Sequence, residues 1–126
     1  MKRDVAKKWV AKLRSGEYEQ GRGYLNDDGR MCCLGVLCEV AIEDGLALAK
    51  SYDHGDADTA VGYGVRVETA GLPMEVVDWA DLGGQLPNST IRDGKGFPLG
   101  YHYLNDISGY SFEQIADVVE SQFIDR

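Results

Sequence analysis

The three cysteines of the chain stand within seven residues, at Cys32, Cys33 and Cys38. A thiol acts as a nucleophile or a metal ligand only as the thiolate, which a helix N-terminus favours. Cys32 and Cys33, at an expected strand-to-helix junction, are therefore better candidates for reactivity than Cys38. The spacing fits no zinc pattern, and both histidines are distant in sequence, so no base lies nearby. Because cysteine is among the most buried residue types, we interpret the cluster as reduced core thiols of a cytosolic protein.

Four potential metal ligands occur within six residues, at Asp53, His54, Asp56 and Asp58. Calcium and magnesium prefer such carboxylate oxygens. The segment does not match the EF-hand pattern, which also requires a glutamate at a fixed later position. We interpret it as a solvated acidic loop and expect no metal site and no cofactor. A hydrolase that uses this loop, or a cysteine nucleophile, is kept as the third of three functional hypotheses.

A short glycine-containing segment, 20–23, carries an arginine between two glycines. Glycine lets a backbone approach a ligand closely, and a guanidinium pairs well with phosphate. The flanking tyrosines offer rings on which a base can stack. The segment is not a P-loop, because it lacks the lysine and the Ser/Thr of that motif; the alternative is a flexible turn into a hairpin. The candidate ligand-binding residues here are Tyr18, Gln20, Gly21, Arg22, Gly23 and Tyr24.

A second basic, glycine-rich loop contains Arg92 and Lys95 and is soon followed by two aromatic side chains, Tyr101 and His102. Aromatic rings beside cationic loops suit a nucleotide-like ligand. Arg92, Tyr101 and His102 are therefore added to the candidate ligand-binding residues. The alternative is an ordinary surface loop.

The length of 126 residues suits a single domain, 1–126. The net charge of −8 argues against binding to duplex nucleic acid, which normally needs a basic surface. It permits a small anionic ligand or a basic protein partner. The chain has no apolar run long enough to span a membrane, and its N-terminal residues do not resemble a signal peptide. We expect a cytoplasmic protein without a membrane partner.

Apolar residues recur at helical spacing in four segments: 4–14, 33–43, 72–82 and from Ser111 to Phe123. Asp4 is the expected N-cap of the first helix, and Ser111 with Gln114 forms a capping box before the last. Turn residues 26–29 between two short apolar runs predict a β-hairpin.

Alternating residues 63–67 predict a short strand. Residues 101–105 fit either a short strand or the start of a turn, and 85–100 a loop. The predicted fold is a single small α+β domain with about four helices packed on a short, mostly antiparallel sheet.

The chain resembles a group of small proteins encoded by bacteriophages. Three runs carry the resemblance, which spans nearly the whole chain and is most specific in the cysteine heptad. They are Lys8-Trp9-Val10-x-x-Leu13-Arg14-Ser15-Gly16-x-Tyr18-x-Gln20-Gly21, Cys32-Cys33-Leu34-Gly35-Val36-Leu37-Cys38, and Leu104-Asn105-Asp106 with Ser111-Phe112-x-x-Ile115-Ala116-Asp117. The resemblance supplies no catalytic residues. It implies an accessory protein in the cytoplasm of the infected host, acting in host takeover or counter-defence.

The leading hypothesis is non-enzymatic binding of a small phosphate-bearing or nucleotide-like ligand, in a homo-oligomer whose subunit interface holds the site. Such a protein would sequester a host immune signal. The second hypothesis is an acidic inhibitor that binds a basic host protein.

Overall fold

The computed structural model describes residues 1–52, 60–86 and 88–125, and it has an α+β fold. Five α-helices occur in this part of the chain, followed by a π-helical turn, η1 (Glu120–Ile124). Two separate strand pairs accompany them: β1 and β2 run parallel, and β3 and β4 antiparallel. The element bounds are α1 (Arg3–Arg14), β1 (Glu19–Gln20), β2 (Arg30–Met31), α2 (Cys33–Glu43), β3 (Lys50–Tyr52), β4 (Val61–Tyr63), α3 (Met74–Trp79), α4 (Tyr101–Asp106) and α5 (Phe112–Val119). The predicted α+β class is confirmed, although the strands form two pairs rather than one sheet.

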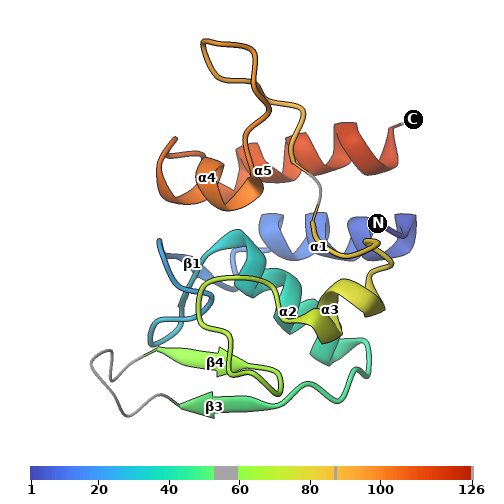
Figure 1. The fold of residues 1–126 in the computed structure, drawn as a ribbon, viewed down its shortest axis with the longest axis vertical. Coiled ribbons are helices and arrows are strands. Elements are labelled where there is room, and N and C mark those ends of the chain that lie inside the picture. Colours follow the sequence, from blue (N-terminus) through green and yellow to red (C-terminus); the bar gives the residue numbers. More distant parts are fainter. Residues whose placement is uncertain (53–59, 87, 126) are drawn as a thin grey trace.

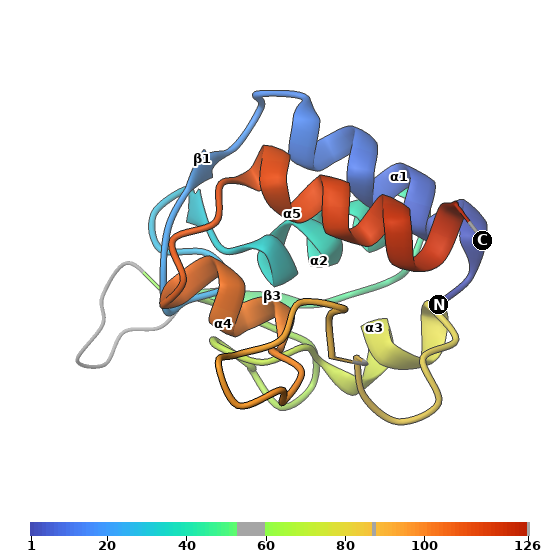
Figure 2. The same cartoon turned by 90° about the horizontal axis from the view of Figure 1, so that it is seen from above.

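Helix α2 is the centre of the fold because it is apolar on almost every side. A helix with this pattern is stable in water only when other elements cover it. It contacts α1, α3, α4 and β2, and α5 lies alongside α1, with α4 next to the start of α5. The β3–β4 pair lies at the far end of the molecule from α5 (Figure 1). Figure 2 shows the same packing from above, with α5 and α1 side by side.

Aromatic side chains fill the space between α1, α4 and the C-terminal helix. The Trp9 ring meets the Tyr101 ring edge-on at 5.6 Å, and Tyr101 in turn contacts Phe123 at 6.4 Å between ring centroids. Trp9 and Tyr101 are both buried, and the Trp9 Nε1 donates to the Cys33 carbonyl at 2.9 Å. This bond fixes the N-terminal end of α2 against α1.

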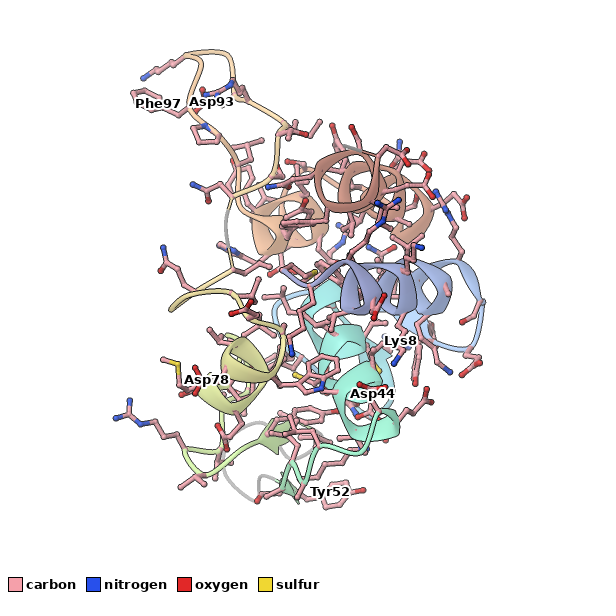
Figure 3. All side chains as sticks on the ribbon, turned by 90° about the vertical axis from the view of Figure 1, so that its right-hand side faces the viewer. Lys8, Asp44, Tyr52, Asp78, Asp93 and Phe97 are labelled. Atoms are coloured by element: carbon pink, nitrogen blue, oxygen red, sulfur yellow. The ribbon has the colours of Figure 1, made fainter. Side chains whose placement is uncertain are left out.

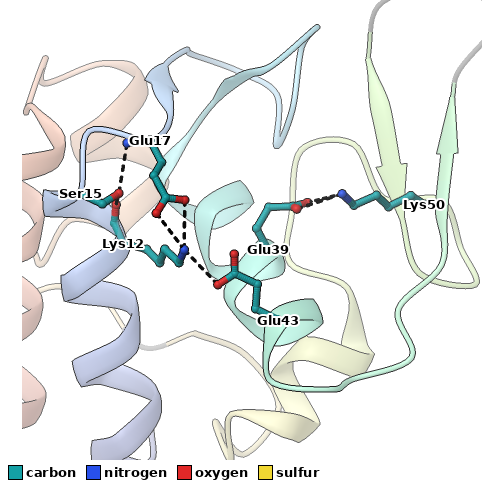
Figure 4. A network of polar contacts seen from close by, with 6 residues as sticks. All are labelled: Lys12, Ser15, Glu17, Glu39, Glu43 and Lys50. Atoms are coloured by element: carbon teal, nitrogen blue, oxygen red, sulfur yellow. Dashed lines mark hydrogen bonds and ion pairs between the residues drawn. The ribbon is translucent and has the colours of Figure 1, made fainter.

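A surface network of charged side chains joins α1, α2 and the segment before β1 (Figure 4). The Lys12 Nζ lies 3.0 Å from a Glu43 carboxylate oxygen and 3.1 Å from one of Glu17. These contacts, with Glu43 as the larger cause, raise the pKa of Lys12. On the other side of α2, Lys50 of β3 pairs with Glu39 at 2.9 Å. Ion pairs at the surface contribute little to the stability of the fold, about 0–1 kcal/mol each.

Some helix boundaries follow the sequence signals and others do not. The capping box of Ser111 and Gln114 is present, with both of its reciprocal hydrogen bonds. Helix α2 spans the predicted 33–43, and α3 is shorter than the predicted 72–82. Asp4 is not the N-cap of α1: Lys2 occupies that position without a side-chain cap, and Asp4 lies in the first turn. There its carboxylate still faces the positive end of the helix dipole.

Two local predictions about strands were wrong. Residues 64–67 form a tight turn after β4, closed by reciprocal backbone bonds of 2.9 Å between Tyr63 and Glu68. The turn needs left-handed backbone at Gly64 and even at Val67, and it leaves Val65 87% exposed. Residues 101–105 belong to the helix α4. Tyr101 and Leu104, three residues apart, lie on the same face of this helix and are buried in the core.

Of the predicted hairpin at 24–32, the turn is present and one further backbone bond joins the two arms, from the Cys32 N–H to the Tyr24 carbonyl at 3.3 Å. Asp28 and Gly29 both have positive φ, as a two-residue type I′ turn requires, and Asp27 and Arg30 exchange both backbone hydrogen bonds. In addition, β2 aligns in parallel with β1.

Gly35 on α2 is required by a close backbone approach. A Cβ built on Gly35 would lie 1.7 Å from the Leu25 carbonyl oxygen, which belongs to the rigid backbone before the hairpin turn. We therefore expect Gly35→Ala to lower the free energy of unfolding by about 3 kcal/mol, the usual cost of overpacking a core. Chemical denaturation measures the change. Gly94→Ala is the matched control because nothing lies within 4 Å of its built Cβ, and an equal loss in both variants would contradict the assignment.

Candidate functional site

The three cysteines are free thiols buried in the core. Cys32 is the N-cap of α2, and the Cys33 Sγ lies 3.6 Å from the Tyr101 carbonyl oxygen. Burial raises the pKa of Cys32 to about 11 and raises those of Cys33 and Cys38 well above the ordinary value. The cost of burying a thiolate therefore exceeds the help of the helix N-terminus. This arrangement agrees with the structural role expected for the cluster.

The acidic segment that contains Asp53, His54, Asp56 and Asp58 lies outside the described residues. Within the described ranges, no group of three or more His, Cys, Asp or Glu side chains is arranged to hold a metal ion. The same part of the chain holds no helix with the length and apolar character needed to cross a bilayer.

Gln20 uses its side chain for internal hydrogen bonds. Its Nε2 donates to the Asn105 Oδ1 and to the Tyr110 carbonyl, each at 2.8 Å, and its Oε1 accepts from the Phe112 N–H at 3.0 Å. Both amide hydrogens and the amide oxygen therefore have partners. Gln20, proposed from the sequence as a ligand contact, instead ties β1 to the start of α5.

Asn105 continues this arrangement and is fully buried. Its Oδ1 also accepts from the Cys33 N–H at 3.2 Å, and its Nδ2 donates to the Gly21 carbonyl and to the Asp106 carboxylate, each at 2.8 Å. We name Gln20 and Asn105 the amide pair. The pair joins β1, the first turn of α2, α4 and the start of α5 through side-chain hydrogen bonds.

The rest of the first glycine segment offers fewer groups to a ligand than its composition suggests. Gly21 is needed because a Cβ there would lie 2.9 Å from the Arg30 Cβ, so its lack of a side chain serves strand packing. Arg22 is exposed, with its guanidinium beside Gly109 in the segment before α5. Gly23 and Tyr24 are also exposed, and Tyr18 is half-buried against the core. The segment therefore leaves Arg22 and Tyr24 accessible but lines none of the clefts described below.

Arg92 lies in a different place, on a loop that projects from the end of the molecule. Figures 1 and 2 both show the loop 89–99 well away from β1. The Arg92 Nη1 donates to the Gly96 carbonyl at 2.8 Å within this loop. The two arginines named as candidate ligand-binding residues are therefore not brought together.

A cleft of about 300 Å³ opens between α3, α4 and the residues 84–86 and 88, and it includes Tyr101 and His102. We name it the α3–α4 cleft. Most of its described floor is apolar, whereas three side chains bear amide or imidazole groups. Its lining residues are Leu34, Gly71, Leu72, Met74, Val77, Gly84, Gln85, Leu86, Asn88, Gly100, Tyr101 and His102.

Tyr101 and His102 contribute to this cleft in different ways. The Tyr101 ring is 1% exposed and is held by Trp9 and Phe123, while its hydroxyl donates to the Gln122 side chain. It therefore forms a wall of the cleft and cannot present its face to a base. His102 is exposed, and its imidazole covers Gly100 so closely that a Cβ on Gly100 would lie 2.8 Å from the ring. His102 is the accessible polar group on this side.

Sequence reasoning missed Gln85 and Asn88, which supply the amide groups of the cleft. Both lie in a segment rich in turn residues, and nothing in such a segment shows which amides face a cavity. The apolar residues of the cleft floor could be predicted only as core residues. The spacing of apolar residues along a helix is the same whether they line a cleft or pack inside the core.

The amide pair yields a stability prediction. Asn105→Asp replaces the Nδ2 donor by an oxygen that faces the Gly21 carbonyl and the Asp106 carboxylate, so both acceptors lose a partner and a charge is buried. We expect the free energy of unfolding to fall by about 3 kcal/mol or more, measured by denaturant titration. Asn88→Asp makes the same exchange at an exposed position and should change it by less than about 0.5 kcal/mol. Equal stability of the two variants would show that the amide pair is unimportant.

Comparison with known proteins gives one match. No curated protein and no solved structure matches the chain. One family model covers residues 1–123, which is almost the whole chain. The chain belongs to the family described as a domain of unknown function, DUF8296.

Proposed function

We propose that this protein is a non-enzymatic binding protein that holds a small nucleotide-like ligand in the α3–α4 cleft. The observation that carries the proposal is the combination of an apolar floor with amide and imidazole groups in one cavity. Ligand sites typically have this composition, in which apolar surface provides affinity and a few polar groups fix orientation.

The chemistry of the lining favours a planar heterocycle. Leu34, Val77 and Leu86 offer apolar contact to the faces of a ring, and Met74 adapts to irregular shapes. The amides of Gln85 and Asn88 each carry both donors and an acceptor, which matches the mixed edge of a nucleobase. The volume of about 300 Å³ is at the lower end for ligand sites, which suits a mononucleotide better than a larger ligand.

His102 is the group best placed for the phosphate of such a ligand. Among the described residues of the lining there is no lysine or arginine, so the phosphate would lie toward the solvent side, beside the exposed imidazole. Pairing is strongest when the imidazole is protonated, because a charge-assisted hydrogen bond is about twice as strong as a neutral one. The three buried thiols, with pKa values raised by burial, support binding over thiolate catalysis.

The resemblance to bacteriophage proteins supplies a biological role for this binding. We propose that the chain acts in the host cytoplasm as a counter-defence factor that removes a nucleotide-derived immune signal. Sequestration requires affinity but no turnover, in agreement with a cleft whose described lining places no serine, threonine or cysteine nucleophile beside the His102 imidazole.

Calorimetric titration with a panel of nucleoside monophosphates and cyclic nucleotides tests the site. For the nucleotide that binds, we expect Asn88→Ala and His102→Ala each to weaken affinity about tenfold, because each removes one hydrogen-bonding group worth about 1.4 kcal/mol. Arg22→Ala is the control and should bind unchanged, since Arg22 does not line the cleft. Loss of binding in Arg22→Ala would move the site to the glycine segment 20–23. A nucleotide recovered chemically altered would favour an enzyme.

A second candidate is an acidic inhibitor of a basic host protein, and one surface feature favours it. Three carboxylates of the C-terminal helix surround a single guanidinium: Arg14 lies 3.5 Å from Glu113, 2.7 Å from Asp117 and 3.1 Å from Glu120. One cation cannot neutralise three anions, so the surface formed by these side chains keeps a negative potential, which attracts cationic partners.

If the protein is such an inhibitor, its binding to the host partner should depend strongly on salt concentration. Capture of host proteins on the immobilised chain should yield a basic partner at low salt that is released at high salt, because counter-ions screen exposed charges. The double variant Glu113→Gln, Asp117→Asn should weaken capture, whereas Asn88→Ala should not. A partner whose capture ignores both salt and the double variant would exclude this candidate.

A further inference from the structure

The projecting loop 89–99, which we name the finger, is held together by its own hydrogen bonds. At its base, the Ser89 N–H donates to the Leu99 carbonyl and the Leu99 N–H to the Ile91 carbonyl, each at 2.8 Å. The Ser89 hydroxyl donates to the same Leu99 carbonyl at 2.6 Å. The base therefore closes like a short hairpin.

The tip is ordered in the same way. Asp93 and Phe97 are joined by an N–H to carbonyl bond of 2.9 Å, and the Asp93 Oδ1 accepts from the N–H groups of Lys95 and Phe97 at 2.8 and 3.0 Å. The Arg92 guanidinium closes the turn by donating to the Gly96 carbonyl. A loop fixed in this way has little conformational freedom left to lose on binding a partner.

The ordered tip displays an aromatic side chain to solvent. Phe97 is 65% exposed, and Figure 3 shows it with Asp93 at the end of the finger. Arg92 and Lys95 make the finger basic, with one net positive charge, on a chain whose net charge is −8. Aromatic residues and arginine are enriched at protein interfaces. The finger therefore combines an exposed aromatic ring with basic side chains, and this combination suits binding to a pocket that is apolar and acidic.

A cleft of this kind exists on the same chain, beside the turn after β4 and the start of α3. Its volume is about 390 Å³, and we name it the β4–α3 cleft. Two apolar side chains at its edge are strongly exposed, Val65 at 87% and Met74 at 56%. Glu68 and Glu75 give it a net negative charge against the single Arg66. Its lining residues are Val65, Arg66, Glu68, Leu72, Met74 and Glu75.

The positions of the two surfaces allow a closed pairing between copies. The finger and the β3–β4 pair lie at opposite ends of the long axis (Figure 1), while the finger and α3 lie on one side of the molecule (Figure 3). A second copy, inverted and facing that side, would bring each finger to the β4–α3 cleft of the other. Such a two-fold contact is isologous and closes at two copies.

We propose that this chain forms a two-fold homodimer in which Phe97 of each copy enters the β4–α3 cleft of the other. Lys95 and Arg92 then face Glu68 and Glu75 across the contact. The α3–α4 cleft shares Leu72 and Met74 with the β4–α3 cleft and is bounded by Asn88 at the base of the finger. The dimer would therefore cover the ligand cleft, but its formation does not depend on a ligand.

Sedimentation velocity over a concentration series tests the dimer without any ligand. The wild-type chain should approach twice its mass of 13.8 kDa. Phe97→Ala should raise the dissociation constant about 30-fold or more, as expected for a central aromatic anchor. Tyr52→Ala is the matched control, because Tyr52 is similarly exposed at 70% but lies on β3 outside both surfaces, and it should dimerise as the wild type does.

A charge exchange gives a second, independent readout. Lys95→Glu should weaken the dimer, and the double variant Lys95→Glu, Glu68→Lys should restore it, because the pair then attracts again. A wild-type chain that stays at 13.8 kDa at every concentration overturns the proposal. So does a dimer that Phe97→Ala leaves intact, one that Tyr52→Ala weakens equally, or growth into larger open assemblies, which a two-fold contact does not allow.

Discussion

The amide pair, in which Asn105 is fully buried and Gln20 partly buried, is the constraint on which the arrangement of the elements depends. Elements that are distant in sequence meet at it, and each presents a backbone group with reduced access to water: the buried Cys33 N–H, and the partly buried Gly21 carbonyl and Phe112 N–H. A buried backbone group without a partner is costly. Two primary amides can satisfy this mixture because each offers both donors and an acceptor. Replacing either by a carboxylate or an apolar residue would leave several elements unsatisfied at once.

The second constraint is steric and comes from the central helix. Because α2 is apolar on nearly all sides, the rest of the chain has to surround it, and the position of Leu25 over Gly35 brings the hairpin turn into direct backbone contact. The cysteines belong to the same packing. Their raised pKa values follow from enclosure among other buried side chains, and their small size lets α4 and α1 approach the start of α2. The composition of the cysteine segment suggests reactive thiols, but the size of these side chains and their packing contacts account for their presence.

The elements with a strong local signal could be predicted from the sequence, whereas only Tyr101 and His102 of the residues that line the α3–α4 cleft were among the candidates. The stripe of α1, the capping box at Ser111 and the bounds of α2 all rest on interactions within a few residues. Residues 101–105 were misjudged because the helical face of α4 contains only Tyr101 and Leu104, too few to reveal a period. Gln20 was read as a ligand contact because its partners, Asn105 and Phe112, are more than eighty residues away. Arg22 and Arg92 were grouped by composition, and their separation is a property of the tertiary fold alone.

The finger and the α3–α4 cleft differ in how freely they can change during evolution. The bonds that order the finger tip join its own residues, from Arg92 to Phe97, so new side chains there leave the packing of the core unchanged. The α3–α4 cleft, in contrast, is lined in part by the core residues Leu34 and Tyr101. A substitution at Tyr101 would disturb the packing of Trp9 against it. Divergence within the family is therefore expected to be rapid at the finger tip and slow along the floor of the cleft. In a dimer of identical chains, changes at the finger tip would be matched by changes in the β4–α3 cleft, whereas changes in the α3–α4 cleft would record ligand choice.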